Sequence, residues 1–221
     1  VHPIFEVFET MGYDALGLGN HEFNYGLDYL HQIINDTTIP VINTNVLNAV
    51  TNQPEFTPYV ILDKQVVDAE GNVSDIKVGI LNVVPEQILN WDKLFLEGKV
   101  TVQDMKEAVE INVAKLQEEG ADIIDFGACS TRPGSLPVGK EEEWKRLEPV
   151  LREVSRVFPG IRVSVDTYWS DVVRRAFDVL GDFVVNDISA GEDDPMMLET
   201  VGELGLEYVA MHKRGNPETM Q

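Results

Sequence analysis

The residues of this chain best suited to chemistry are carboxylates, amides and a histidine that each close an apolar segment. They are Asn82, Asp125, Asp166, Asn186 with Asp187, and His212. Such side chains can hydrogen-bond a nitrogen-rich ligand or stabilise a positive charge that develops during a reaction. Polar groups in a mouth lined by apolar strands need partners, so we expect the set to bind a ligand. Capping or turn formation is the alternative for any single member.

A short segment after Asp125 offers groups that bind an anion. Ser130 and Thr131 carry hydroxyl groups, and Arg132 carries a guanidinium fork. The chain has a formal net charge of -21, with 17 Lys and Arg against 38 Asp and Glu. An anionic ligand must therefore be held by local groups such as these. A capped turn before the next helix is the alternative interpretation.

Apolar segments alternate with segments of helical spacing in the second half of the chain. Strands are predicted at 76–84, around 123, and at 161–166, 183–187 and 207–212, with helices at 102–119, 141–157, 170–180 and 195–204. This alternation predicts a barrel-type α/β array of about five parallel strands joined by right-handed crossovers. The carboxyl ends of such strands collect the chemistry, which would bring the polar residues into one mouth.

Residues 1–77 predict a smaller α/β segment. A helix is expected at 4–11, and the apolar run 15–18 leads into Asn20 and His21. A glycine-flanked turn would present this pair to a ligand, and a loop histidine satisfied by its neighbours is the alternative. The remaining elements predicted are a helix at 26–35, a strand at 40–46 and a hairpin whose strands include 59–62 and 76–84.

The composition excludes several classes of protein. A chain of 221 residues with 43% hydrophobic content can build one large or two small soluble domains. The acidic balance opposes binding to nucleic acid or to an anionic membrane, and no apolar run reaches membrane-spanning length. One cysteine, Cys129, without a secretory signal indicates a cytoplasmic protein. The absence of an initial Met indicates a piece of something longer.

Four segments resemble, in order and spacing, the dihydropteroate synthases. They read G-A-D-I-I-D-F-G-A-C-S-T-R-P-G, S-V-D-T-Y, V-V-N-D-I-S-A-G and M-H-K-R-G-N-P-E-T-M-Q. The likeness is dense from about residue 120 and extends, more weakly, back to residue 78. It implies a TIM barrel that condenses hydroxymethyl-dihydropterin diphosphate with p-aminobenzoate, releasing diphosphate, in folate biosynthesis.

The same resemblance implies how the pterin is held. Asp166 and Asn186 would hydrogen-bond the pterin ring, and Met211 would pack against it. Asp125 would help to stabilise the cationic pterin that remains when diphosphate departs. Asp125 and Asp166 are therefore the expected catalytic residues, and both act electrostatically, because the sequence shows no nucleophile.

The resemblance also implies how the other substrate groups are held. Ser130, Thr131 and Arg132 would order p-aminobenzoate and contact diphosphate, and Asn82 would meet the Mg²⁺ that accompanies it. The chain departs from the family at N-V-V-P-E-Q-I, where the family has a loop resembling N-V-T-P-D-S-F. It also ends before the family's later pterin-binding Asp, its K-x-x-R region and its final Arg-x-His. We therefore expect impaired turnover, and association into homo-oligomers through open strand edges.

The first part of the chain has a different resemblance. The segments G-Y-D-A-L-G-L-G-N-H-E-F-N-Y-G and I-P-V-I-N-T-N-V are similar to calcineurin-like metallophosphoesterases of the 5'-nucleotidase type. The likeness, which extends to about residue 118, implies Asn20 as a metal ligand and His21 as the alternative catalytic residue. It also implies Mn²⁺ or another divalent pair, for which the ligand set is incomplete, because the family's D-x-H, G-D and G-H-x-H motifs are missing.

The sequence as a whole therefore predicts a chimera. Residues 1–77 would be a metallophosphoesterase-like α/β segment, and residues 78–221 a partial dihydropteroate-synthase-like barrel. Three functions remain open: a pterin-binding synthase-like transferase, a metal-dependent phosphoesterase, and an inactive chimeric or designed α/β protein. The first, with pterin diphosphate and p-aminobenzoate as partners, is the expectation that we carry forward.

Overall fold

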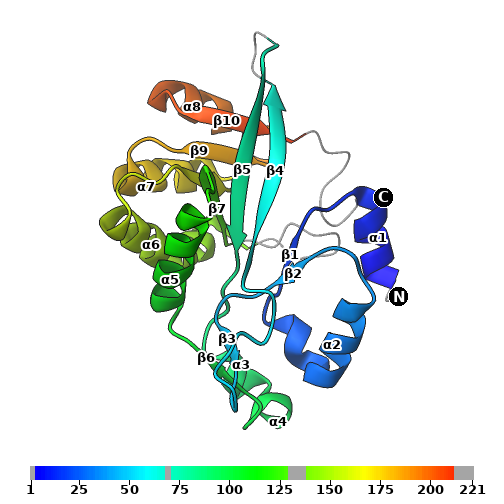
Figure 1. The fold of residues 1–221 in the computed structure, drawn as a ribbon. Helices are drawn as coiled ribbons and strands as arrows, with labels where there is room; N and C mark the ends of the chain where they lie inside the picture. Colours follow the sequence, from blue (N-terminus) through cyan, green and yellow to red (C-terminus); the bar gives the residue numbers. More distant parts are fainter. Residues whose placement is uncertain (1–2, 68–70, 129–137, 212–221) are drawn as a thin grey trace. The chain divides into compact units, whose positions relative to one another are not determined.

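The computed structural model describes residues 3–67, 71–128 and 138–211 and divides the chain into two compact units, Val1–Ala121 and Asp122–Gln221. Both units combine helices and strands, so the chain is an α/β protein (Figure 1). The domain division at residues 1–77 and 78–221, which the sequence predicts from two family resemblances, is a separate matter and stays a prediction.

The first unit contains short strands, short helices and one long hairpin. Its elements are α1 (Pro3–Met11), β1 (Leu16–Gly17), the 3-10 helix η1 (His21–Tyr25), α2 (Leu27–Asn35), β2 (Val41–Ile42), β3 (Val46–Asn48), β4 (Tyr59–Val67), β5 (Val73–Leu81), α3 (Ile88–Trp91), α4 (Lys93–Leu96), β6 (Val100–Val102) and α5 (Met105–Glu118). Strands β1 and β2 pair in parallel, whereas β3 with β6 and β4 with β5 pair antiparallel. An apolar cluster that includes the fully buried Phe23 and Leu30 forms the core.

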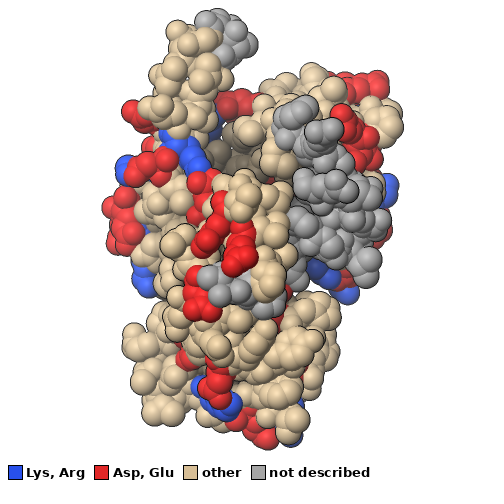
Figure 2. All heavy atoms as spheres, turned by 90° about the vertical axis from the view of Figure 1, so that its right-hand side faces the viewer, with Lys and Arg blue, Asp and Glu red and all other residues tan. Residues whose placement is uncertain are grey.

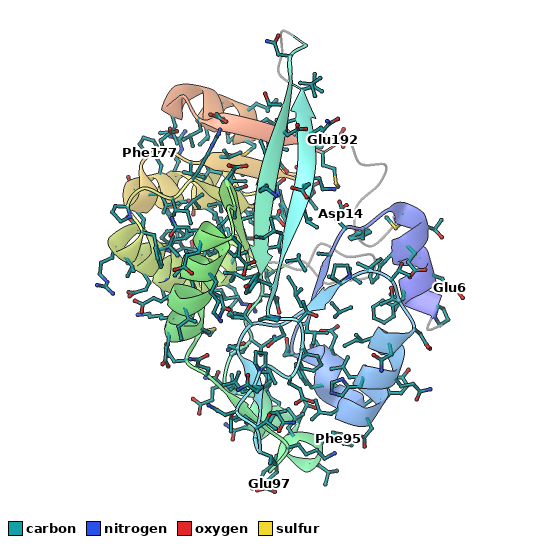
Figure 3. All side chains as sticks on the ribbon, in the orientation of Figure 1. Glu6, Asp14, Phe95, Glu97, Phe177 and Glu192 are labelled. Carbon is teal, nitrogen blue, oxygen red and sulfur yellow. The ribbon has the colours of Figure 1, made fainter. Side chains whose placement is uncertain are left out.

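The second unit repeats a strand and a helix. Its elements are β7 (Ile123–Gly127), α6 (Lys140–Val157), β8 (Val163–Asp166), α7 (Ser170–Leu180), β9 (Val184–Asp187), α8 (Met197–Leu204) and β10 (Glu207–Ala210). The strands lie in the order β10, β9, β8, β7 and all three neighbouring pairs are parallel. Fully buried side chains such as Ile124, Leu151 and Val165 hold the helices on the strands, and side chains fill the space between them (Figure 3).

The observed elements follow the sequence expectations closely in the second unit. The helix expected at 170–180 is α7, and those expected at 141–157 and 195–204 begin at 140 and 197. Four of the five strands expected to run parallel are β7 to β10. The fifth expected strand, 76–84, lies in the first unit, where β5 pairs antiparallel with β4. The short elements α3, α4 and β6 were not expected.

Candidate functional site

Three of the predicted site residues meet where β7, β8 and β9 end. Asp166 is in register with Gly127 on β7 and with Asn186 on β9. The Asn186 Nδ2 donates to Asp125 Oδ1 at 3.4 Å, which connects the two outer strands across β8. All three polar side chains are half-buried. Parallel pairing thus brings two carboxyl groups and one amide together at the edge that the sequence predicted.

Gly127 makes room for Asp166, and sequence reasoning missed it. A Cβ at position 127 would lie 3.2 Å from the Asp166 Cβ and 3.3 Å from Asp166 Oδ2. The Asp166 side chain therefore lies close to Gly127 on β7. A larger residue at 127 would push the carboxyl group away from its place between β7 and β9.

Burial and mutual repulsion raise the pKa values of the site carboxyl groups. Burial raises the pKa of Asp125, although hydrogen bonds from Ser164 and Asn186 oppose the shift. Burial raises the pKa of Asp166 well above its ordinary value, and the charges of Asp125, Glu143 and Asp187 add to the shift. The cluster thus resists being fully ionised. A ligand that donates hydrogen bonds or carries positive charge would favour the ionised carboxylates.

Asp187 closes the same strand end but has a structural role. It is fully buried, and its carboxylate accepts hydrogen bonds from the Ser189 amide at 2.7 Å, the Gly191 amide at 2.9 Å and the Tyr208 hydroxyl at 2.7 Å. Burial, and then the bond to Asp187, raise the pKa of Tyr208. Asp187 therefore fixes the turn after β9 and ties it to β10, rather than facing a ligand as the sequence suggested.

Met211 lies next to this arrangement. Its backbone N–H donates to the Asp187 carbonyl oxygen at 3.0 Å, which continues the β9 and β10 pairing beyond the end of β10. The residue is 43% exposed. An exposed apolar side chain at this strand end is available to pack against a flat ligand.

Glu143, on the first turn of α6, was also missed by sequence reasoning. It is fully buried, and neither carboxylate oxygen accepts a hydrogen bond of normal geometry within the described residues. Burial raises its pKa to about 7, while the Thr167 hydroxyl and the charge of Arg146 oppose the shift. A signal was present in the sequence, because Glu143 precedes the buried Leu147 and Leu151 at intervals of four residues.

The remaining residues predicted for the synthase site belong to other parts of the chain than this cluster. Ser130, Thr131 and Arg132 lie outside the described residues, as does His212. Asn82 belongs to the first unit, where its backbone N–H donates to the Thr44 hydroxyl oxygen at 3.0 Å and its side chain lies beside Asn43 and the Leu18 carbonyl oxygen. A Cβ at Gly17 would lie 3.0 Å from the Asn82 Cγ. The Asn82 side chain is thus packed against the end of β1, and its expected contact with Mg²⁺ stays a prediction.

The residues predicted for the phosphoesterase site lie at the start of η1. His21 is exposed and its Nδ1 lies 3.3 Å from Asn24 Nδ2, while Asn20 is half-buried. Within the described ranges, no group of three or more His, Cys, Asp or Glu residues is arranged to hold a metal ion. The side chains described here therefore do not fit the dinuclear centre that the resemblance implies.

The family of the chain follows from its sequence match. The family model described as pterin binding enzyme matches residues 78–221, which is more than half of the chain and includes Asp125, Asp166 and Asn186. This chain belongs to the pterin-binding enzyme family. Among solved structures, it is similar to the dihydropteroate synthase of Xanthomonas albilineans, with 33% identity and a TM-score of 0.51. That likeness covers 70% of this chain and 53% of the other.

The chain is also similar to phosphoesterases. It is 45% identical over 124 residues to the 2',3'-cyclic-nucleotide 2'-phosphodiesterase/3'-nucleotidase of Salmonella typhimurium, which is 56% of this chain and 19% of that protein. The solved calcineurin-like phosphoesterase YfkN of Bacillus subtilis is 36% identical with a TM-score of 0.59, over 75% of this chain and 48% of the other. The chain thus spans about a fifth of the Salmonella protein and about half of each solved chain.

The two similarities overlap along the chain. A phosphoesterase match of 124 residues is longer than the segment before residue 78, so it continues into the part that the pterin-binding family model matches. This pattern of similarity is chimera-like, and it confirms that the middle of the chain resembles both families.

Two surface features complete the description. Acidic side chains are prominent on the face shown in Figure 2, which fits the formal net charge of -21. Throughout the ranges that the structure describes, each helix is too short or too polar to cross a bilayer.

Proposed function

We propose that this chain binds the pterin ring of hydroxymethyl-dihydropterin diphosphate at the ends of β7 to β10 and transfers the pterin to p-aminobenzoate. The observation that carries the proposal is the convergence of Asp125, Asp166 and Asn186, joined by the 3.4 Å hydrogen bond from Asn186 to Asp125. A pterin presents ring N–H and amino donors beside a carbonyl acceptor. Two carboxylates and one amide match that pattern.

The reaction follows from the charges on this cluster. The bond between the pterin methylene carbon and the diphosphate oxygen breaks, and diphosphate leaves with the electron pair. As positive charge develops on the pterin, the ionised forms of Asp125 and Asp166 become more favourable. The two carboxylates then stabilise the cationic pterin. The amine of p-aminobenzoate then donates its lone pair to the methylene carbon and loses a proton.

Mg²⁺ would neutralise charge on the departing diphosphate. Asn82, whose side-chain carbonyl oxygen is a type of ligand that Mg²⁺ accepts, is the residue that would contact this ion. We also expect binding to exceed turnover, because the N-V-V-P-E-Q-I segment lacks a hydroxyl of the family loop.

Calorimetric titration with 6-hydroxymethylpterin, in the presence of Mg²⁺ and diphosphate, tests the proposal. The unaltered chain should bind saturably, and Asp166→Asn should weaken binding at least about tenfold, because a charge-assisted hydrogen bond contributes about 1.5–3 kcal/mol. Asp182→Asn, at an exposed position of the same unit, is the matched control and should bind as the unaltered chain does. Absence of saturable heat from the unaltered chain would overturn the proposal.

Phosphoester hydrolysis is the second candidate, favoured by the 45% identity to the Salmonella phosphodiesterase. It predicts Mn²⁺-stimulated release of phosphate from a nucleotide, with chelator-treated protein as the control, and loss of that activity in His21→Ala. If no phosphate is released in the presence of metal, this candidate is excluded.

An inactive chimera is the third hypothesis. It predicts a cooperative melting transition whose midpoint is not shifted by pterin, nucleotide or metal.

A further inference from the structure

A cavity in the first unit carries charged groups that the proposed pterin site does not use. Its volume is about 310 Å³, and it is lined by Leu27, Asp28, His31, Asn48, Val50, Glu55, Gly98 and Lys99. The lining comes from α2, from the end of β3 and the segment that follows it, and from the turn between α4 and β6. A cavity of this volume is large enough for a small ligand.

Glu55 orders one wall of the cavity. Its Oε1 is hydrogen-bonded to His31 Nε2 at 2.7 Å, and its Oε2 accepts from Asn48 Nδ2 at 2.9 Å. The Glu55 side chain is only 13% exposed, and the His31 ring stacks on Phe56 with 5.2 Å between the ring centroids. These contacts hold the three polar side chains in place before any ligand binds.

The other two charged side chains of the lining are Asp28 and Lys99. Both residues are exposed, and neither side chain forms an ion pair or a hydrogen bond with another residue that the structure describes. A carboxylate and an ammonium group are therefore available to a ligand in the same cavity.

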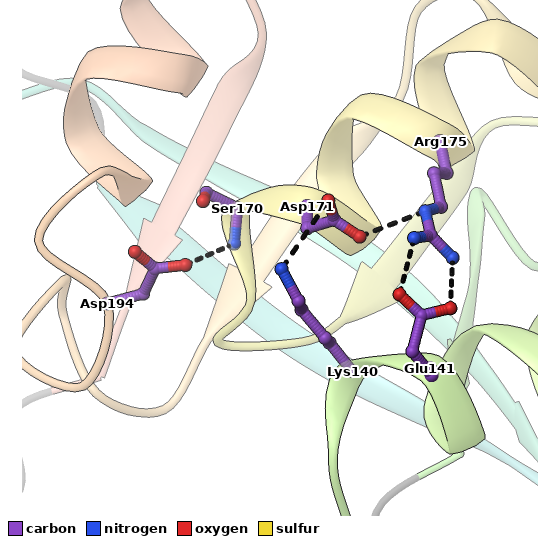
Figure 4. Close-up of polar contacts among 6 residues, drawn as sticks. All are labelled: Lys140, Glu141, Ser170, Asp171, Arg175 and Asp194. Atoms are coloured by element: carbon purple, nitrogen blue, oxygen red, sulfur yellow. Dashed lines mark hydrogen bonds and ion pairs between the residues drawn. The ribbon is translucent and has the colours of Figure 1, made fainter.

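Charged groups at the start of α6 and α7, in the second unit, are arranged differently. Glu141 forms two hydrogen bonds with Arg175, at 2.6 and 2.9 Å, and Lys140 lies 3.7 Å from Asp171 (Figure 4). Each of these four groups has a partner of opposite charge on the other helix. The pairs fasten α6 to α7, so their role is structural.

The charges of the cavity indicate which class of ligand fits. The formal net charge of -21 opposes the approach of a simple anion, and a simple cation would be repelled by Lys99. A zwitterion has no net charge, so it can pair with both available groups without opposing the field of the chain. Leu27, which is 5% exposed, and Val50 add apolar surface to the same lining.

We propose that this cavity binds a zwitterionic α-amino acid with an apolar side chain. The Asp28 carboxylate holds the ligand's ammonium group, the Lys99 ammonium group holds its carboxylate, and Leu27 and Val50 pack against its side chain. The cavity belongs to the first unit, so this proposal does not depend on the pterin site and either can fail alone.

NMR of the His31 imidazole tests the site, because the chain has only four histidines and His31→Gln identifies the signal. Titration with L-leucine should shift the His31 signal progressively to saturation. The analogue 4-methylpentanoate lacks only the ammonium group, and 3-methylbutylamine lacks only the carboxylate. Each analogue should bind about fivefold more weakly than leucine, because it loses one charge-assisted contact at an exposed position.

The exposed positions of Asp28 and Lys99 allow matched variants. Asp28→Asn should bind leucine about fivefold more weakly but should not weaken 4-methylpentanoate, which has no ammonium group. Lys99→Met should weaken leucine to the same extent but should not weaken 3-methylbutylamine. Lys106→Met, exposed on α5 and outside the cavity lining, is the control and should bind leucine as the unaltered chain does.

Three outcomes would overturn the inference. If leucine leaves the His31 signal unchanged at the highest concentration that dissolves, the cavity is not an amino-acid site. If leucine and its two analogues bind alike, the cavity recognises only the apolar chain and not a zwitterion. If both variants bind leucine as tightly as the unaltered chain, Asp28 and Lys99 do not hold the ligand.

Discussion

Replacing Glu143 by Gln should change how the stability of the folded chain depends on pH. Burial raises the Glu143 pKa from 4.5 to about 7. Between these values the folded chain holds a proton that the unfolded chain has released, so the free energy of unfolding falls as pH rises. A shift of this size corresponds to about 3 kcal/mol, most of it lost between pH 5 and pH 8. The Gln variant has no ionisable group at this position, so its free energy of unfolding should not show this pH-dependent decrease.

The change in the free energy of unfolding with pH, rather than its absolute value, reports on Glu143. A buried glutamine amide that lacks partners costs about 1–3 kcal/mol at every pH. The raised pKa values of Asp125 and Asp166 add a decline of the same sign to both proteins. Because the charge of Glu143 contributes to the raised pKa of Asp166, the difference between the two proteins reports on Glu143 together with its effect on Asp166.

Urea unfolding at a series of pH values from 5 to 8 measures this difference. The free energy of unfolding of Glu143→Gln, relative to the unaltered chain, should rise by about 2–3 kcal/mol across the range. Glu148→Gln, at a half-buried position whose carboxylate pairs with Arg152, provides the control for loss of another carboxylate on the same helix. Parallel curves for Glu143→Gln and the unaltered chain would show that Glu143 titrates alike in the folded and unfolded states, which contradicts its enclosure.

Three further changes probe the supports of the site. Gly127→Ala places a Cβ 3.2 Å from the Asp166 Cβ, so we expect about tenfold weaker pterin binding by calorimetry, with a stability loss of about 1 kcal/mol in urea. Tyr208→Phe removes a donor from the buried Asp187 and should cost about 1–3 kcal/mol in urea unfolding. Asp104→Ala removes the cap that accepts from the Lys106 and Glu107 amides at the start of α5, and thermal melting should show a loss of about 1 kcal/mol. Unchanged pterin binding in the first, or unchanged stability in the other two, contradicts the assigned contact.

The sequence predicted the fold best where apolar residues recur at one regular spacing over many residues. Amphipathic helices such as α7 have apolar spacing that is visible without a structure, whereas α3 and α4 have only four residues each. The β4 and β5 hairpin was predicted from the turn near residue 71, but its extent was not, because the solvated ends of these strands show little alternation.

The sequence predicted the polar residues at the strand ends of the candidate site, but it did not predict the residues that pack around them. Asp125, Asp166 and Asn186 were expected to lie together because the ends of parallel strands meet at one edge, and the observed register brings them together, while their roles stay predictions. Gly127 was missed because its role depends on which residue stands opposite on β8. Glu143 was missed because a run of glutamates ordinarily marks a solvated helix face, and only packing shows that one of them is enclosed.

The most direct test of the pterin site follows the side-chain amide of Asn186 by ¹H–¹⁵N NMR, with Asn186→Ala identifying the signal. If the ring binds among Asp125, Asp166 and Asn186, adding 6-hydroxymethylpterin should shift the Asn186 amide signals progressively to saturation, because the 3.4 Å bond to Asp125 is exchanged for bonds to the ligand. Asn186 amide signals that stay unchanged at saturating pterin would contradict the account.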